Sequence, residues 1–454
     1  MLQWAADVTI ILSIDAPKNL RKQAHAMFNS VTISNFRTFQ TAVLDELGIT
    51  TAFIGRNGVG KSNLLHALEM LGRLASADSQ NQYYFYDDIP HANQRTDRQE
   101  PLQFAANIIL PSGRYLYELS VVANFTRAAD AKGMSRQLQL TERVAWTGRK
   151  SSAKLLPIFE RHNELITIHE ENSPRADSGT PPTNVLTNHD TPALAALSAL
   201  LPTKSPIRRL TDPLRLFLKQ VRYYSLDEPA RITASPTVIT GGEYNEWVTK
   251  YLTSGVLGKP VTLQILHMAL TMEDHFSDLK ERLGDNGLKL IDDINIIDIL
   301  FSGIKPPKLD PDTGLLDPKS FVLMNFRLGR PRVVRQFSQL SQGTRRLVRL
   351  LTAMAYGENS VMLVEHPEDS IHRGLVKKVT ALFATGYCPS QFFLSTHSDA
   401  VLNGLKPEDV RFVSEERGQS TVRRMSEVEC KVAGRYIDSD DEGTLADFVH
   451  SIEE

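Results

Sequence analysis

A single glycine-rich segment constrains what this chain can fold into more than any other feature. Gly55 to Ser62 fits the pattern G-x-x-x-x-G-K-S and lies between an apolar run at 49–54 and a helical stretch at 63–74. Glycines let the backbone N–H groups of such a loop turn inward around phosphate oxygens, and the N-terminus of the following helix adds positive potential. The order strand, loop, helix therefore predicts a phosphate-binding loop, or P-loop, rather than an incidental glycine turn.

Two side chains of the P-loop carry chemistry of their own. Lys61 is predicted to reach the β- and γ-phosphates of a nucleotide, and the hydroxyl of Ser62 is predicted to bind Mg²⁺. We therefore expect ATP and Mg²⁺ as cofactors. The residues expected to surround the nucleotide at this point of the chain are Gly55, Arg56, Asn57, Gly58, Val59, Gly60, Lys61, Ser62 and Asn63.

A second motif, L-S-Q-G-T-R-R at 340–346, opens a predicted helix. Ser341 and Gly343 would cap the N-terminus of a helix in any protein, so the motif is weak when taken alone. The functional interpretation is a second anion site, in which Ser341, Gly343 and the helix N-terminus hold the γ-phosphate of a nucleotide bound by the opposite subunit. The order of the motifs along the chain favours this interpretation.

Two fully apolar runs, 361–364 and 392–394, predict buried parallel strands;. Glu365 follows the first run and is expected to hold Mg²⁺ through water, the alternative being a core strand followed by solvent-facing acids. His397 closes the second run. It is predicted to sense the γ-phosphate or the attacking water through one hydrogen bond, the alternative being a structural histidine.

The remaining chain is predicted to form two lobes, an insertion and two ends. The N-terminal lobe is expected to contain an antiparallel meander and an exposed, flexible loop at 172–194. Helical periodicity predicts a mainly helical insertion, and we extend it over 288–304. The predicted divisions are an extension at 1–26 that the fold does not need, an N-terminal lobe at 27–206, the insertion at 207–319, a C-terminal lobe at 320–425 and an acidic tail at 426–454. The C-terminal lobe contains the motif at 340–346 (the signature), the strand that ends at Glu365 (the Walker B strand) and the switch histidine His397.

Composition sets limits on location and partners. With 51 basic and 53 acidic side chains in 454 residues, the charge balance neither supports nor excludes DNA as a partner;. The two cysteines, Cys388 and Cys430, cannot form a disulfide framework or a four-ligand zinc site, which predicts a reducing, cytoplasmic location;. An apolar run at 8–14 is too short to span a bilayer, and we expect no membrane association.

The motifs together resemble those of ABC-type ATPase heads of the SMC/RecF-related group. More narrowly, they resemble the AAA-type ATPases found with overcoming-lysogenization-defect (OLD) nucleases and in the Septu, PARIS and retron anti-phage systems. The resemblance covers most of 28–125 and 320–415. It rests on Asn35-Phe36-Arg37, the P-loop, the signature, Pro367-Glu368 with Ile371-His372, and Ser395 to Ser398. It implies an α/β fold, the head of an ABC-type P-loop NTPase. Such a head contains a mixed sheet with an antiparallel β subdomain, and here it would also carry the helical insertion.

The resemblance also implies an assembly. Two subunits would form a head-to-head homodimer, or a higher homo-oligomer, with two ATP molecules held between the P-loop of one subunit and the signature of the other. Arg37 and Phe36 would lie near the nucleotide, and 369–372 would cross the dimer interface. Gln80 and Gln82 are the candidates for the glutamine that, in this family, connects the bound nucleotide to the rest of the protein.

One departure from the family pattern concerns catalysis. Most of these ATPases end the acidic strand with two acids, the second acting as general base, and here that position is His366. A neutral imidazole can accept a proton. Either Glu368 takes over the role of base or hydrolysis is slow, so we predict ATP-dependent closure rather than rapid turnover.

The leading expectation is an ATPase of bacterial anti-phage defence that acts as sensor and scaffold for a separate effector, a nuclease. No nuclease motif is visible in the sequence. Only 57 residues follow His397, and the run 438–441 is predicted to be solvated acids rather than metal ligands;. A RecF-like ATPase of DNA repair or maintenance is the alternative. The ATP-binding subunit of a transporter is a third hypothesis, disfavoured by the length and the insertions.

Overall fold

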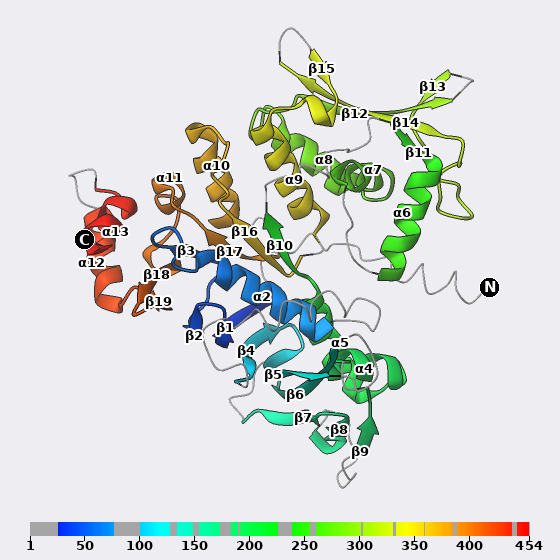
Figure 1. The fold of residues 1–454 in the computed structure, drawn as a ribbon. Helices are drawn as coiled ribbons and strands as arrows, with labels where there is room; N and C mark the ends of the chain where they lie inside the picture. The colour runs from blue at the N-terminus through cyan, green and yellow to red at the C-terminus, as the bar shows by residue number, and fades with distance from the viewer. Residues whose placement is uncertain are drawn as a thin grey trace.

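A computed structural model shows three sheets with helices packed between them (Figure 1). Residues 1–25, Gln80, Gln82 and the run 438–441 lie outside the residues that it describes. The expectations for those segments therefore stay predictions. The described residues are 26–76, 100–127, 134–148, 154–172, 183–188, 191–225, 238–254, 260–300, 303–329, 333–357, 359–384, 388–437 and 443–453.

A six-stranded sheet forms the centre of the molecule. Its strands, in spatial order, are β10 (Val221–Ser225), β16 (Val361–Glu365), β17 (Gln391–Ser395), β3 (Thr50–Ile54), β18 (Val410–Glu416) and β19 (Gln419–Arg424). The first five are parallel, and β19 pairs antiparallel with β18. The predicted buried parallel strands at 361–364 and 392–394 are therefore confirmed.

Helices cover both faces of β16, β17 and β3, which explains the uninterrupted apolar sequences of these strands. Phe53, Leu363 and Phe393 pack with α2 (Lys61–Ser76) in one core. Their neighbours Met362 and Val364 point the other way and pack with α9 (Gln342–Tyr356) and α10 (Arg373–Ala384) in a second core. Side chains alternate between the two faces of a strand, so a strand covered on both faces needs apolar residues at every position.

A second sheet is an antiparallel meander of eight strands, and it confirms the predicted β subdomain. In spatial order it runs β2 (Phe39–Leu44), β1 (Met27–Phe36), β4 (Leu102–Leu110), β5 (Gly113–Arg127), β6 (Met134–Thr147), β7 (Leu156–His162), β8 (Leu165–Ile168) and β9 (Thr183–Leu186). One face packs on α2, α4 (Ala193–Leu200) and α5 (Pro206–Lys219) in the first core. The mixed α/β class is thereby confirmed.

A third sheet lies at the opposite end of the molecule from the meander (Figure 1). It consists of β11 (Val238–Thr240), β14 (Phe321–Leu328), β12 (Asp293–Leu300), β13 (Gly303–Lys305) and β15 (Val333–Arg335). Helices α6 (Gly241–Ser254), α7 (Val261–Thr271) and α8 (Glu273–Leu283) pack with it and with α9 in the second core.

The segment predicted as a mainly helical insertion at 207–319 is only partly helical. The stretch 288–304 forms β12 and β13 instead of a helix, because Asp293, Ile294, Asn295 and Ile296 alternate polar and apolar with the period of a strand;. In addition, α5 packs in the first core and β10 is an edge of the central sheet. The boundary at 207 therefore cuts through the core.

Two segments predicted to be loose are ordered where the structure describes them. Within 172–194, Thr183–Leu186 forms β9 and pairs with β8, and Ala193 is buried at the start of α4. The tail at 426–454 forms α12 (Glu427–Ile437) and α13 (Leu445–Glu453). Apolar residues recur along α13 at helical spacing and pack on β18 in a third core, which the acidic composition of the tail concealed;.

No helix in the described part of the chain is both long and apolar enough to cross a membrane.

A buried charged residue fixes the corner where the meander meets α4. Arg161 is fully buried and donates to the main-chain oxygens of Asn163 (2.5 Å), Asn188 (3.0 Å) and Thr191. Glu142 accepts from the main-chain N–H of Ala193 at 2.5 Å, and so it caps α4. Burial raises the pKa of the Glu142 carboxyl, while the charge of Arg161 and the hydrogen bonds oppose that rise;.

Replacing Glu142 is expected to cost more stability than replacing any exposed acid. Glu142→Ala would remove the carboxylate whose charge opposes that of the buried Arg161, and it would leave α4 without its cap, a loss of about 3–5 kcal/mol;. The free energy of unfolding in urea, compared between the variant and the wild type, measures this loss. Glu118→Ala is the matched control, because Glu118 is 41% exposed and pairs with Arg143 at the surface, where a loss below about 1 kcal/mol is expected;. Equal losses in the two variants would contradict the role of Glu142.

Candidate functional site

The P-loop leaves the end of β3 and runs into the first turn of α2, as predicted. Gly55, Gly58 and Gly60 have φ angles of 137°, 84° and 111°, which favour glycine;. Gly55 is also required for space, since a Cβ atom there would lie 2.1 Å from the Val413 main-chain oxygen. Lys61 is buried, and its amine donates to the main-chain oxygens of Gly55 and Arg56 at 2.9 Å each. The lysine therefore lies within its own loop.

Glu365 approaches the P-loop from β16, another strand of the central sheet. It is the last residue of β16, and its carboxylate accepts hydrogen bonds from the Ser62 hydroxyl and from the Tyr223 hydroxyl of β10. Burial raises the pKa of Glu365, but these two hydrogen bonds, together with the charges of His366 and His66, lower it by a larger amount, so the net pKa lies below the usual value;. The Tyr223 ring is held in turn by the ring of His66 on α2, with the centroids 4.5 Å apart.

The donor set at this point fits Mg²⁺. A hydroxyl and an ionised carboxylate converge beside the N-terminus of α2, and both are the hard oxygen ligands that Mg²⁺ prefers;. Mg²⁺ commonly uses one or two protein oxygens and completes its shell with water and phosphate oxygens. Ser62 and Glu365 match that pattern.

The turn between β1 and β2 is tied to the first turn of α2. Arg37 donates from Nη1 to the Asn63 side-chain oxygen at 3.0 Å, and the Asn63 amide donates to Thr38 Oγ1 at 3.0 Å. The Arg37 guanidinium lies 5.2 Å from the centre of the Phe36 ring. The structure thus brings Arg37, Phe36 and Asn63 beside the P-loop.

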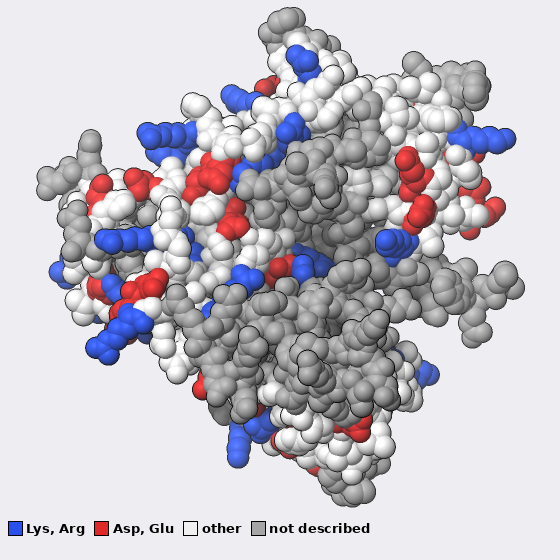
Figure 2. Space-filling view, in the orientation of Figure 1, with Lys and Arg blue, Asp and Glu red and all other residues white. Residues whose placement is uncertain are grey.

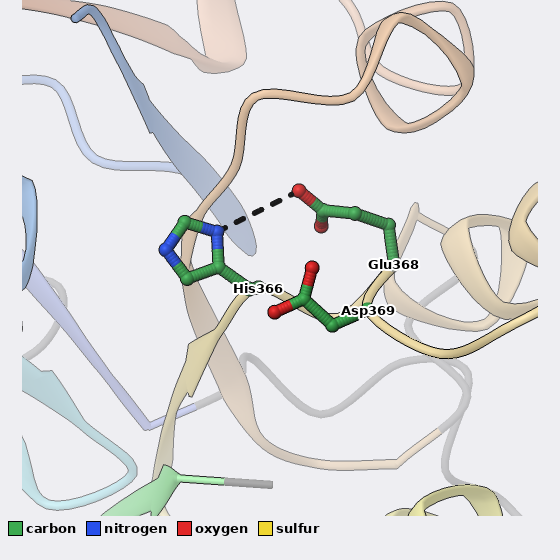
Figure 3. A group of neighbouring side chains, drawn as sticks. All are labelled: His366, Glu368 and Asp369. Atoms are coloured by element: carbon green, nitrogen blue, oxygen red, sulfur yellow. Dashed lines mark ion pairs between the residues drawn. The ribbon is translucent and has the colours of Figure 1, made fainter. Parts of the chain in front are cut away.

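A second cluster follows β16 and β17, with Glu368 at its centre. Its Oε1 accepts from Thr396 Oγ1 at 2.8 Å and from the His397 main-chain N–H at 3.1 Å. His366 Nδ1 lies 3.7 Å from the same oxygen, and the His366 and His397 rings stack with centroids 5.4 Å apart. His366, Glu368 and Asp369 turn toward one another in the loop after β16 (Figure 3). Among the described residues, Glu368 Oε2 is buried without a hydrogen-bond partner.

Charges in this cluster are set by burial and by the close contacts. Burial raises the pKa of Glu368, but the hydrogen bonds from His366, His397 and Thr396 outweigh it and lower the net pKa. The contact with Glu368 raises the pKa of His366. Burial, followed by the charge of Lys61, lowers the pKa of His397. A carboxylate that stays ionised can accept a proton from water.

The signature helix packs against the loop of this second cluster. Ser341 caps α9 by accepting from the Thr344 N–H at 3.2 Å. A Cβ atom on Gly343 would lie 2.1 Å from the Ser370 main-chain oxygen, so only glycine fits there. Arg346 Nη2 donates to the His366 main-chain oxygen at 3.0 Å. Within its own subunit, the signature therefore supports the loop that carries Glu368.

Three contributors were not predicted from the sequence. Tyr223 holds Glu365, Thr396 holds Glu368, and Arg346 holds the His366 carbonyl. A signal for Tyr223 existed, because V-R-Y-Y-S at 221–225 is rich in β-branched and aromatic residues, as buried strands often are;. Thr396 lies inside the predicted S-T-H-S run, and its role depends on where Glu368 folds.

Comparison with known families gives two matches. Residues 27–109 match a family described as "AAA ATPase domain", and residues 270–403 match one described as "AAA domain, putative AbiEii toxin, Type IV TA system". The first match contains the P-loop, and the second contains the signature, Glu365 and His397. Both matches support an ATPase of the AAA type, the broader function expected from the sequence.

One curated relative and several solved structures are similar to parts of the chain. The DNA replication and repair protein RecF of Nocardioides sp. (strain ATCC BAA-499 / JS614) is 46% identical over 46 residues, which are 10% of this chain and only 11% of that protein. An SMC head bound to the C-terminal winged-helix domain of ScpA aligns at a TM-score of 0.43 with 14% identity, over 89% of this chain and 99% of the other. An SMC head bound to a ScpA domain from Pyrococcus furiosus aligns at 0.42 with 11% identity, over 91% and 100%. Scores this low do not bear on function.

The packing role of Gly343 can be separated from its capping role. Gly343→Ala would force its new methyl group into the Ser370 carbonyl and cost about 1–3 kcal/mol, as overpacking does. Ser341→Ala would remove only the cap, at about 1 kcal/mol. Thermal unfolding without nucleotide measures both.

Gly434→Ala is the matched control, because nothing lies within 4 Å of a Cβ atom at that position in α12. A helical glycine in open space is expected to gain up to about 1 kcal/mol from the change. If Gly343→Ala is as stable as Gly434→Ala, the contact with Ser370 does not constrain the helix start.

Proposed function

We propose that this chain is an ATPase whose subunits dimerise around ATP and Mg²⁺, and that it serves as sensor and scaffold for a separate effector in defence against phage. The observation that carries the ATP-dependent part is the convergence of Ser62 and Glu365 at the start of α2, with Glu368 held between the ends of β16 and β17. This arrangement supports the proposal of a phosphate cradle, a metal position and a proton acceptor along one edge of the central sheet.

The residues would act in sequence as follows. Lys61 exchanges the carbonyls of Gly55 and Arg56 for phosphate oxygens, and the loop N–H groups hold the rest of the phosphate chain. Ser62 and Glu365 hold Mg²⁺, which when bound neutralises charge that develops on the phosphates. Tyr223 keeps Glu365 oriented while this happens.

Glu368 is the better candidate for general base than His366. Its Oε1 is fixed by Thr396 and the His397 N–H, and its lowered pKa keeps the carboxylate ionised, as a group that accepts a proton from water must be;. His366 instead faces Glu368 and stacks on His397, so its position supports the carboxylate. Glu368 would thus replace the acid that the family pattern places at 366.

Dimerisation around ATP would complete the site. Ser341 is exposed at the N-terminus of α9, where backbone N–H groups and the helix dipole favour an anion;. An ATP γ-phosphate from a second subunit would supply that anion, as the resemblance to sandwich-type ATPases implies. Each signature would then report the nucleotide state of its partner to its own Glu368 loop.

Support for the defence role is the sequence resemblance and the match of 270–403 to the AAA domain family named for AbiEii. A RecF-like role in DNA repair is the second candidate, supported by the short match to a RecF protein. On the face shown in Figure 2, basic and acidic side chains are interspersed over the described surface rather than gathered into one basic stripe.

Two substitutions should separate ATP binding from hydrolysis. Lys61→Ala is expected to weaken ATP binding about 10- to 100-fold, because a charge-assisted contact with phosphate is lost. Glu368→Gln is expected to bind ATP normally and to hydrolyse it about 10²- to 10⁴-fold more slowly. Isothermal titration and steady-state phosphate release measure the two properties.

Glu273→Gln is the control for this pair, since Glu273 is an exposed acid on α8. It should match the wild type in both assays. Normal turnover by Glu368→Gln, together with inactivity of His366→Ala, would assign the base to His366 instead.

A mixing experiment tests whether the site is shared between subunits. Lys61→Ala damages the P-loop, and Ser341→Arg damages the signature, so each variant alone should be inactive. In a mixed dimer, the intact P-loop of one subunit would face the intact signature of the other. Mixing should therefore restore up to about a quarter of wild-type activity, since half of the dimers carry one of two sites. No recovery on mixing would show that each chain is complete by itself.

The nature of the partner needs a separate measurement. Stable co-purification with a nuclease subunit encoded beside this chain is the expected result for a defence scaffold. ATP-dependent binding to duplex ends or junctions, without such a subunit, would favour the RecF-like alternative.

A further inference from the structure

A hollow of about 160 Å³ lies between two hairpin turns beside the P-loop. One turn joins β1 to β2 and the other joins β18 to β19. The motifs singled out from the sequence include the first turn but none of the second. The residues that line the hollow are Arg37, Thr38, Phe39, Gln40, Arg417, Gly418 and Gln419.

Both turns are two-residue hairpins that present an arginine. In the first, Phe36 pairs with Phe39 and leaves Arg37 and Thr38 as the turn. In the second, Glu416 pairs with Gln419 and leaves Arg417 and Gly418. Arg417 is exposed, and it forms no ion pair or hydrogen bond with the described residues. Two guanidinium groups thus border one small hollow.

The second turn is packed directly on the P-loop. A Cβ atom on Gly60 would lie 2.8 Å from Ser420 Oγ and 3.0 Å from Thr38 Oγ1. The Ser420 N–H donates to the Thr38 main-chain oxygen at 2.9 Å, which joins the two turns. Ser420 is 3% exposed, and its hydroxyl has no hydrogen-bond partner among the described residues. This hydroxyl therefore lies at the contact between the second turn and the P-loop, beside Gly60.

Strand order fixes which end of a nucleotide would lie here. The residues proposed to act on the γ-phosphate, Glu365, Glu368 and His397, come from β16, β17 and the loops that follow them, all on one side of β3. The hollow lies on the other side of β3, next to β18 and β19. A phosphate chain held by the P-loop with its γ end toward Glu368 therefore directs its nucleoside end toward the hollow.

We infer that the β18–β19 turn forms one wall of the nucleoside subsite, with Arg417 and Gln419 positioning the base and ribose of the bound nucleoside triphosphate against Arg37 and Gln40. This inference rests on the proposed ATP-binding function. The planar guanidinium groups stack on a base, and the amides of Gln40 and Gln419 offer donors and acceptors to its edge. The turn gives the C-terminal lobe its own contact with the nucleoside.

Comparing ATP with inorganic tripolyphosphate tests the inference, because only ATP has a nucleoside. Affinities of the full-length wild type and of Arg417→Ala are measured by titration with each compound. Arg417→Ala is expected to weaken ATP binding about tenfold, the loss typical of a cation–π contact, and to leave tripolyphosphate binding within about twofold. Arg423→Ala is the matched control. That arginine of β19 lies over Phe412 and does not line the hollow, so it should change neither affinity.

Gln419→Ala supplies an independent readout of the same wall. Loss of a hydrogen bond to the base edge is expected to change the ratio of ATP to GTP affinity by about threefold or more. Arg417→Ala should not abolish the discrimination that Gln419 provides.

The outcomes distinguish this inference from the proposed function. If the wild type binds ATP, Lys61→Ala weakens that binding as expected and Arg417→Ala binds normally, the β18–β19 turn lies outside the site and this inference alone fails. Equal weakening of ATP and tripolyphosphate by Arg417→Ala would also overturn it, because the arginine would then act on phosphates. A wild type that binds neither compound overturns the proposed function as well. Unchanged thermal unfolding of the exposed-residue variants confirms that they fold.

Discussion

Parallel pairing of β16, β17 and β3 is the constraint on which the rest of the molecule depends. It brings the carboxyl end of β3 beside those of β16 and β17, which come more than 300 residues later in the chain, at one edge of the central sheet. Glu365 pairs in register with Ser395, which places the Ser62 contact and the Glu368 cluster side by side. Because both faces of these strands are covered, their position is held by two separate cores. The site is as rigid as the sheet that carries it.

Features defined by residues close together in the sequence could be predicted, and features that depend on distant contacts could not. The P-loop, the apolar strands and Glu365 were predictable, because spacing and composition within about ten residues define them. Tyr223 was not, since its role depends on β10 pairing with a strand whose acid lies 142 residues later. Helical periodicity predicts a helix where β12 lies, since its isoleucines suit either element, but its first residues alternate polar and apolar with the period of a strand;. The tail was expected to be solvated, since its acids outnumber the few apolar residues that bury α13.

The glycines of the P-loop satisfy two demands at once. Their positive φ angles turn the backbone inward, and two of them also lie against the hairpin of the C-terminal lobe. Gly55 rests on the Val413 carbonyl, and Gly60 rests on Ser420 and Thr38. The loop that binds phosphate is therefore enclosed by strands from both ends of the chain. Contacts from both ends of the chain therefore surround a motif that itself occupies only eight residues.

The contact between Gly343 and Ser370 has a mechanical consequence. Main chain rests on main chain there, without an intervening side chain that could change rotamer and absorb displacement. Arg346 adds a hydrogen bond to the His366 carbonyl in the same loop. The start of α9 and the loop that bears Glu368 are therefore expected to move together. A displacement of the exposed start of that helix would therefore have to move the loop that carries the carboxylate.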